Sequence, residues 1–210
     1  IGQSPRPDVI GEMERILGKG YELLEKGALD DFTLEDVQKI KIEEGQGVLV
    51  TRMRDGTEIK ITHDIVNPVI QKRITELEAE GVEIILLVCT GRFPEFESNV
   101  LVVQPSNIIR GVTKAAMRKG RMASILPSMQ QVGGSPRERE EDGLVTYLDS
   151  ASPYGPIEEV EKLGDRLAKQ NVDLIVLNCM GFDYNHKRII REKTGKPVLQ
   201  SSAMVARALK

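Results

Sequence analysis

Cysteine and histidine are scarce in this sequence, which has only two of each among 210 residues. Two cysteines are too few for a disulfide framework, so we expect a reducing, cytoplasmic location. No apolar run approaches the roughly 20 residues that a membrane-spanning helix needs, which excludes a bilayer-spanning segment. A secretory signal pattern is also missing.

The chain also has no excess of positive charge. The net charge is −3, and charges of both signs are scattered through the chain, which argues against nucleic-acid binding. With 40% hydrophobic and 29% charged residues, the composition is that of a globular chain of one or two domains. The loop at residues 1–6 resembles the end of a strand, so we expect a short apolar strand upstream of Ile1 in the natural protein.

Strand and helix patterns alternate along the chain. Asp55-Gly56 separates two β-rich runs and predicts a hairpin. The runs at 84–88 and 174–177 are continuously apolar, which is typical of strands covered on both faces. The charged segment 130–143 is expected to be a loop with a short helix. Apolar periodicity predicts helices over 7–17, 64–80, 106–119, 157–170, 183–193 and 203–209.

One phrase occurs twice. "VEIILLVCTG" at 82–91 and "VDLIVLNCMG" at 172–181 share Val, Ile, Leu, Cys and Gly in register, and each follows a polar helix. The repeat predicts an α/β fold of two similar lobes, with parallel sheets flanked by helices and a pseudo-twofold relation. We place the N-terminal lobe at 1–104, with 201–210 packing back on it, and the C-terminal lobe at 105–200.

The repeat puts both cysteines, Cys89 and Cys179, at the carboxyl ends of parallel strands, where ligands collect in such sheets. Gly91 and Gly181 follow them and allow close approach of the backbone to a ligand. Two thiols on opposite faces of one carbon can remove a proton beside a carboxylate and return one from the far side. Backbone N–H groups would stabilise the enolate-like intermediate without a cofactor.

The phrases "IGQSPRPDV", "LLVCTGRFPEF", "ASPYG" and "LNCMGFDYNH" resemble the AroM family, within the aspartate/glutamate/hydantoin racemase superfamily, over nearly the whole chain. The resemblance implies that Cys89 and Cys179 are the catalytic cysteines, that Ser4 touches substrate and that Thr90 helps to hold a carboxylate. After the second cysteine, amino-acid racemases tend to have Thr-His. Met180-Gly181 is closer to the hydantoin racemases, which argues against an amino-acid substrate.

Each assignment has a simpler alternative. A strand-end cysteine is often a small core residue, and a disulfide between the two is disfavoured by the expected location. Arg6 either captures a carboxylate in its loop or pairs with Asp8 at the surface. His63 and His186 lack the spacing of metal ligands, so no metal is expected, and His186 is either a helix-start partner or a proton relay.

The sequence therefore predicts cofactor-independent proton transfer at carbon, of the racemase or isomerase type, on a small anionic carboxylate in a cleft between the lobes. The expected site comprises Cys89 and Cys179 as acid and base, with Ser4, Arg6, Thr90, Gly91, Met180 and Gly181 around the substrate. Two alternatives remain open: a non-catalytic small-molecule binding or sensory protein, and a decarboxylase that uses one thiol. No nucleic-acid or membrane partner is expected, and a homodimer is left open.

Overall fold

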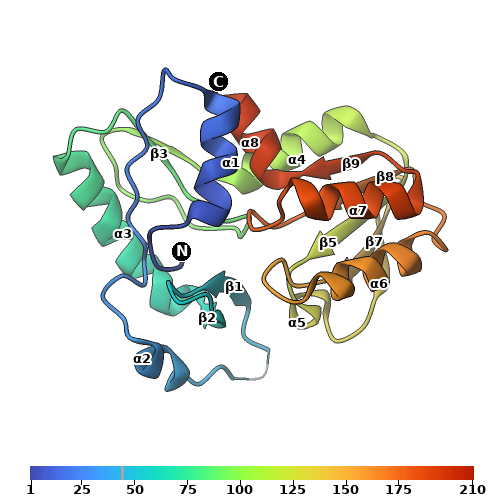
Figure 1. Ribbon diagram of the computed structural model, residues 1–210, viewed down its shortest axis with the longest axis horizontal. Coiled ribbons are helices and arrows are strands. Elements are labelled where there is room, and N and C mark those ends of the chain that lie inside the picture. The colour runs from blue at the N-terminus through green and yellow to red at the C-terminus, as the bar shows by residue number, and fades with distance from the viewer. Residues whose placement is uncertain (44) are drawn as a thin grey trace. The chain divides into compact units, whose positions relative to one another are not determined.

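The computed structural model describes residues 1–43 and 45–210 and is an α/β protein (Figure 1). The chain divides into two compact units. Unit 1 comprises Ile1–Pro7 and Gly20–Ser106, and unit 2 comprises Asp8–Lys19 and Asn107–Lys210. In the described part of the chain, no helix has the length and apolar character needed to cross a bilayer.

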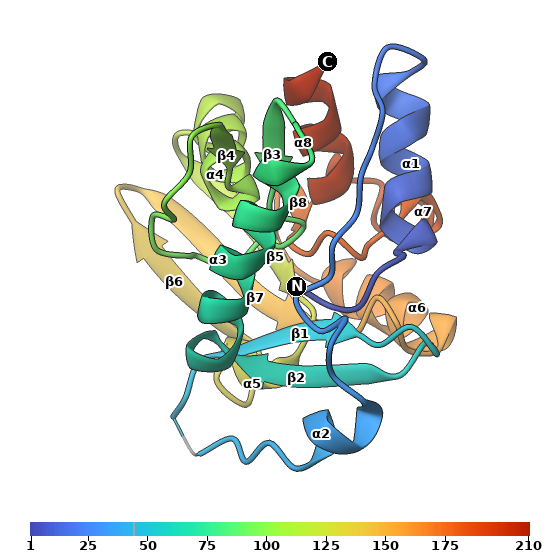
Figure 2. The same cartoon turned by 90° about the vertical axis from the view of Figure 1, so that its left-hand side faces the viewer.

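Unit 1 is built on an antiparallel hairpin of β1 (Val48–Arg52) and β2 (Glu58–Thr62). The chain reverses between them at Asp55-Gly56, as predicted, and Gly56 takes the positive φ that the turn requires (97°). Figure 2 shows the hairpin with α2 (Leu34–Gln38) and α3 (His63–Ala79) nearby. Thr33 caps α2 through a reciprocal capping box with Asp36.

The second sheet of unit 1 has two parallel strands, β3 (Ile84–Leu86) and β4 (Leu101–Val103). The unit's core combines the inner face of α3 with residues of the hairpin and of β3. Its α3 members are Val66, Ile70 and Ile74, which follow the i, i+4 spacing of one helix face. The helix α4 (Pro105–Ala116) follows β4 directly.

Unit 2 holds a five-stranded sheet in the order β6-β7-β5-β8-β9. All neighbouring strands are parallel except β6, which is antiparallel to β7. The helices α6 and α7 pack side by side on one face over the main core, with α4 and α8 on the other side (Figure 1). The bounds are β5 Gly120–Leu126, α5 Met129–Val132, β6 Arg137–Glu141, β7 Leu144–Ser150, α6 Ile157–Leu167, β8 Leu174–Leu177, α7 Tyr184–Thr194, β9 Val198–Gln200 and α8 Ser201–Leu209.

Two segments belong to different units than the sequence suggested. The expected lobes were 1–104 and 105–200, with 201–210 returning to the first. The structure groups 201–210 with unit 2 because α8 leaves β9 without a connecting loop and packs on that strand. The helix α1 (Pro7–Leu17) joins unit 2 from Asp8 onward, and Gln200 donates a hydrogen bond to Glu12 on it (2.7 Å).

The repeated phrase has similar local structure in both copies. In each, a helix leads into a short strand that pairs in parallel with the next strand, and Ile85 and Ile175, equivalent in the repeat, face Val102 and Val198. The copies differ in their surroundings, since β8 lies inside a five-stranded sheet and β3 has one partner. The pseudo-twofold relation of whole lobes therefore remains a prediction.

The prediction of a loop with a short helix over 130–143 is wrong at 137–141, which form β6. Asp142 and Gly143 make the two-residue turn to β7, both with positive φ (53° and 79°). Asp142-Gly143 is thus a second Asp-Gly hairpin signal in the sequence. It was missed because the strand before it consists of five charged residues and lacks the apolar alternation that predicts a strand. All residues from 137 to 142 are exposed to solvent.

A buried ion pair closes the end of β7. The Asp149 carboxylate is fully buried and accepts two hydrogen bonds from the Arg166 guanidinium of α6, both 3.0 Å long. Arg166 also donates to the Ser150 carbonyl (3.2 Å). The pair ties the carboxyl end of β7 to α6 and holds the loop that follows.

We predict that Arg166→Ala lowers the free energy of unfolding by about 2 kcal/mol, because Asp149 would keep a buried charge without its partner. This loss of stability is small for a buried ion pair. The Arg166 side chain is 42% exposed, so in the variant water can take over part of its interaction with Asp149. Urea unfolding measures the change. Arg188→Ala, which breaks an exposed pair with Glu192, is the control and should change stability by less than about 0.5 kcal/mol. Equal effects of the two variants would contradict the assignment.

The strand β6 lies at the edge of the five-stranded sheet, where its free side could pair with a second copy (Figure 2). Opposite residues in an antiparallel pair project to the same face, and β6 carries Glu138 and Glu140 on one face and Arg137, Arg139 and Glu141 on the other. On the face of Glu138 and Glu140, a two-fold pairing would therefore set Glu against Glu.

We predict that the double substitution Glu138→Thr and Glu140→Thr causes concentration-dependent self-association, measured by light scattering. The control Glu158→Gln and Glu161→Gln removes the same charge from the exposed side of α6 and should not associate further. Equal behaviour of the two double variants would show that edge repulsion is not the cause.

Candidate functional site

Both cysteines leave a parallel strand at its carboxyl end. Cys89 stands three residues after the end of β3, and Cys179 two residues after the end of β8. Neither forms a disulfide. Each is followed at the second position by glycine, so both strand–Cys–x–Gly segments keep the register of the sequence repeat.

Cys89 is partly buried and packs against the core of unit 1. Its amide donates to the Leu87 carbonyl (2.7 Å), and its Sγ accepts from the Gly91 N–H (3.3 Å). Burial raises the pKa of the Cys89 thiol, while the Gly91 and Thr90 amides and the nearby Arg6 guanidinium oppose that increase. The thiol is therefore the favoured form in the protein without ligand.

Ser4 is hydrogen-bonded to Asp30. Its amide and its hydroxyl donate to the two carboxylate oxygens, each at 2.6 Å, and Gly27 N–H donates to the same group (2.7 Å). The guanidinium of Arg54 donates to the Ser4 carbonyl (2.7 Å). Because its proton is used by Asp30, the Ser4 hydroxyl in this conformation has only acceptor capacity left for a ligand. The sequence contained no signal for Asp30, which is 26 residues away.

Arg6 lies on the Cys89 side of unit 1. Its backbone N–H donates to Glu25 (2.7 Å), which holds the loop. Its Nη1 lies 3.2 Å from the position that a Cβ would take on Gly2, and its charge acts on Cys89. Arg6, Thr90, Gly91 and Cys89 therefore form one group in unit 1.

Cys179 and Met180 are buried at the end of β8, and Cys179 is 7% exposed within the main core of unit 2. The Cys179 carbonyl accepts from the Phe182 N–H (3.4 Å), and the Phe182 carbonyl accepts from the Gln200 side chain (2.8 Å). These bonds fix the turn that carries Met180 and Gly181. The simpler alternative, a core role for Cys179, is consistent with this burial.

Tyr154 covers Gly181. A Cβ on Gly181 would lie 2.5 Å from the Tyr154 hydroxyl oxygen and 2.7 Å from two ring carbons, so only glycine admits the ring here. Tyr154 belongs to the "SASPYGP" loop after β7, and its N–H donates to the Ser152 hydroxyl (3.0 Å). In the sequence, the position of Tyr154 in a loop after a strand is the one signal that it could line the site.

His186 is a helix-start partner. Asp183 caps α7 and accepts from the His186 N–H (3.0 Å), while the Asp183 N–H donates to His186 Nδ1 (3.1 Å). The His186 side chain, whose Nδ1 lies 2.6 Å from an Asp183 carboxylate oxygen, is the main cause that holds the pKa of Asp183 below its usual value. The other histidine, His63, packs edge-on against Phe93 with 5.1 Å between ring centroids. Among residues 1–43 and 45–210, no three His, Cys, Asp or Glu side chains converge as metal ligands would.

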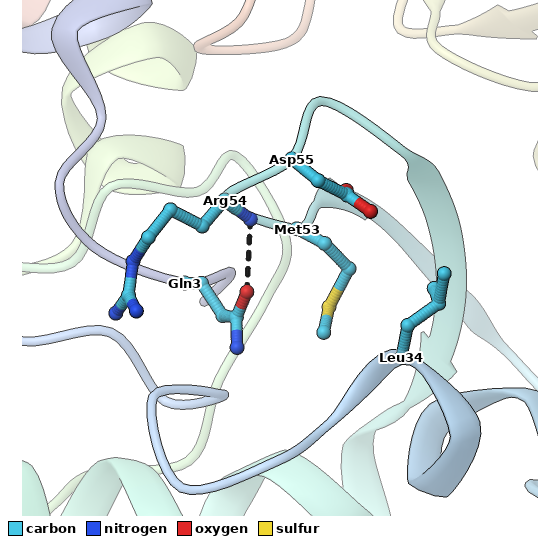
Figure 3. A pocket seen from close by; sticks show the side chains of 5 residues that line it. All are labelled: Gln3, Leu34, Met53, Arg54 and Asp55. Carbon is cyan, nitrogen blue, oxygen red and sulfur yellow. Dashed lines mark hydrogen bonds between the residues drawn. The ribbon is translucent and has the colours of Figure 1, made fainter.

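An open hollow of about 350 Å³ lies elsewhere in unit 1 (Figure 3). The N–H of Arg54 donates to the Gln3 side chain (2.8 Å), and the Gln3 amide donates to the Phe32 carbonyl (2.7 Å). Both ends of the Gln3 amide are thus used by the protein. No cysteine lines this hollow, whose residues are Gln3, Leu34, Met53, Arg54 and Asp55.

The candidate residues therefore fall into two groups, each within its own unit, and each group is termed a candidate half-site. The Cys89 half-site contains Arg6, Thr90 and Gly91, and the Cys179 half-site contains Met180, Gly181 and Tyr154. Among the expected residues, Ser4 directs both its amide and its hydroxyl to another side chain, the Asp30 carboxylate.

The family model described as AroM protein matches residues 1–210. No curated protein matches the chain. Because the match spans the full length of the sequence, the chain belongs to the AroM family.

Proposed function

We propose that this protein catalyses proton transfer at a carbon next to a carboxylate, without a cofactor, as a racemase- or isomerase-type enzyme. Cys89 and Cys179 would be the acid and base, as in the aspartate/glutamate/hydantoin racemase superfamily that the sequence resembles. The observation that carries the proposal is the equivalence of the two cysteines, which follow matching parallel strands and precede matching glycines.

The chemistry needs one thiolate and one thiol. The thiolate removes the proton beside the carboxylate, and the thiol delivers a proton to the opposite face of the same carbon, which inverts its configuration. Negative charge grows on the carboxylate in between. Backbone N–H groups such as that of Gly91, and the charge of Arg6, would stabilise it.

The environment of Cys89 suggests its role in one direction of the reaction. Burial favours its protonated form, so it suits delivery of a proton to the intermediate. Cys179 would then remove the proton. In the reverse direction the roles exchange, and Cys89 must lose its proton as the substrate binds.

The proposed substrate is a small anionic carboxylate, held by Arg6, Thr90, Gly91, Met180 and Gly181. Ser4 would accept a hydrogen bond only from a hydroxyl or N–H group of the substrate, and not from its carboxylate, because its own proton goes to Asp30. The proposal includes a cytoplasmic location, and it leaves the substrate's identity and a homodimer open.

One observation favours the non-catalytic alternative. Cys179 packs inside the core of unit 2, as a structural cysteine does. A binding or sensory protein could use the same half-sites without proton transfer. A decarboxylase would need only one of the two thiols, and its product would lack the carboxyl group.

We predict that the parent protein exchanges the proton beside the carboxylate of at least one small carboxylic acid with deuterium from D2O. Proton NMR of a panel of such acids measures the loss of signal. Cys89→Ala and Cys179→Ala should each reduce this exchange by about 100-fold or more, the usual contribution of a general acid or base.

Val176→Ala is the matched control, because it truncates a buried side chain on β8 and keeps both thiols. It should retain exchange once the folded fraction is taken into account. Exchange that survives both cysteine substitutions would contradict the proposal, as would an absence of exchange with every acid. Dependence on one cysteine with release of CO2 would indicate the decarboxylase.

We predict that Cys89 alkylates more slowly at pH 7 than an ordinary cysteine, whose pKa is about 8.5, because burial raises its pKa. The Cys179→Ala variant isolates Cys89, and the rate with iodoacetamide is measured against pH. Arg6→Gln should move the midpoint to still higher pH by removing a nearby positive charge, while Arg6→Lys keeps it in place. A midpoint at or below that of free cysteine would contradict the raised pKa.

A further inference from the structure

The hydroxyl of Thr51 is buried without a hydrogen-bond partner. Thr51 is 1% exposed, and its Oγ1 has no partner among the residues that the structure describes. It lies on β1 between Leu49 and Met53, and side chains at alternate positions of a strand share a face. Leaving a buried hydroxyl unpaired is costly, so such a group calls for an explanation.

The side chains of Thr51 and Arg6 both lie close to Gly2. The position of a Cβ on Gly2 would lie 2.5 Å from Thr51 Oγ1, 2.5 Å from the Arg52 carbonyl oxygen and 3.2 Å from Arg6 Nη1. A side chain there would collide with the hydroxyl, so glycine lets both groups approach the same point. The result is a hydroxyl donor beside a guanidinium, which is the donor set that a carboxylate accepts.

The same strand face reaches the Cys89 turn. Leu49 Cδ2 lies 2.8 Å from the position of a Cβ on Gly91, and the charge of Arg6 acts on Cys89. Thr51 is two residues from Leu49 on that face. Thr51 and Arg6 therefore belong to the Cys89 half-site, all within unit 1.

We propose that Thr51 and Arg6 together form the carboxylate-binding subsite of the Cys89 half-site, with the Thr51 hydroxyl donating to one carboxylate oxygen and the Arg6 guanidinium pairing with the charge. This subsite rests on the proposed function, to which it adds a donor and a position for the anion. A bound carboxylate gives the unpaired hydroxyl its acceptor.

The test measures binding through protection of Cys89. In the Cys179→Ala background, Cys89 is the one cysteine left, and malonate or acetate should slow its alkylation by iodoacetamide. Adding Thr51→Val, which keeps the shape and removes the hydroxyl, should weaken the affinity for the protecting acid by about tenfold. Thr51→Ser keeps the hydroxyl and should retain protection.

Thr62→Val, a buried threonine at the other end of the hairpin, is the control and should leave protection unchanged. Thermal melting shows whether Thr51→Val folds. The subsite would be overturned if the acids protected Cys89 equally with and without Thr51→Val in the Cys179→Ala background. It would also be overturned if neither acid protected Cys89 in the Cys179→Ala protein. Protection does not require turnover, so failure of deuterium exchange with intact protection would reject the proposed reaction alone.

Discussion

Parallel strand pairing is the constraint on which the candidate site depends. Because β3 runs parallel to β4, and β8 runs parallel to β5 and β9, each cysteine emerges at a carboxyl end where loops gather. The strands supply rigid starting points, and the short turns after them leave the thiols little freedom. In unit 2 the hydrogen bonds of Phe182 and the cap at Asp183 hold this turn further.

Burial then sets the chemistry of these turns. A thiol that is surrounded by core residues is protonated more firmly than one in water, and Cys89 shows this effect. Its amide neighbours and Arg6 act in the opposite direction without cancelling the burial. At Ser4, the carboxylate of Asp30 already takes the donors that an anionic ligand would need, so the anion would find its donors closer to Arg6.

Local signals in the sequence were sufficient for much of the fold and for the cysteine turns. The apolar stripe of α1 and the Asp55-Gly56 turn each depend on neighbouring residues, and both were predicted. The strand β6 was missed because its pairing with β7, rather than an apolar pattern, makes it a strand. Asp30 and Thr51 could not be predicted as site residues, since their positions depend on contacts between segments distant in the chain.

The two half-sites are equivalent in sequence and unequal in structure. Gly91 is covered by the apolar side chain of Leu49, whereas Gly181 is covered by the phenol of Tyr154. A racemase converts one mirror image into the other, so its acid and base exchange roles and have similar tasks in each direction. The different side chains beside Gly91 and Gly181 are therefore easier to reconcile with the isomerase form of the proposed reaction than with the racemase form.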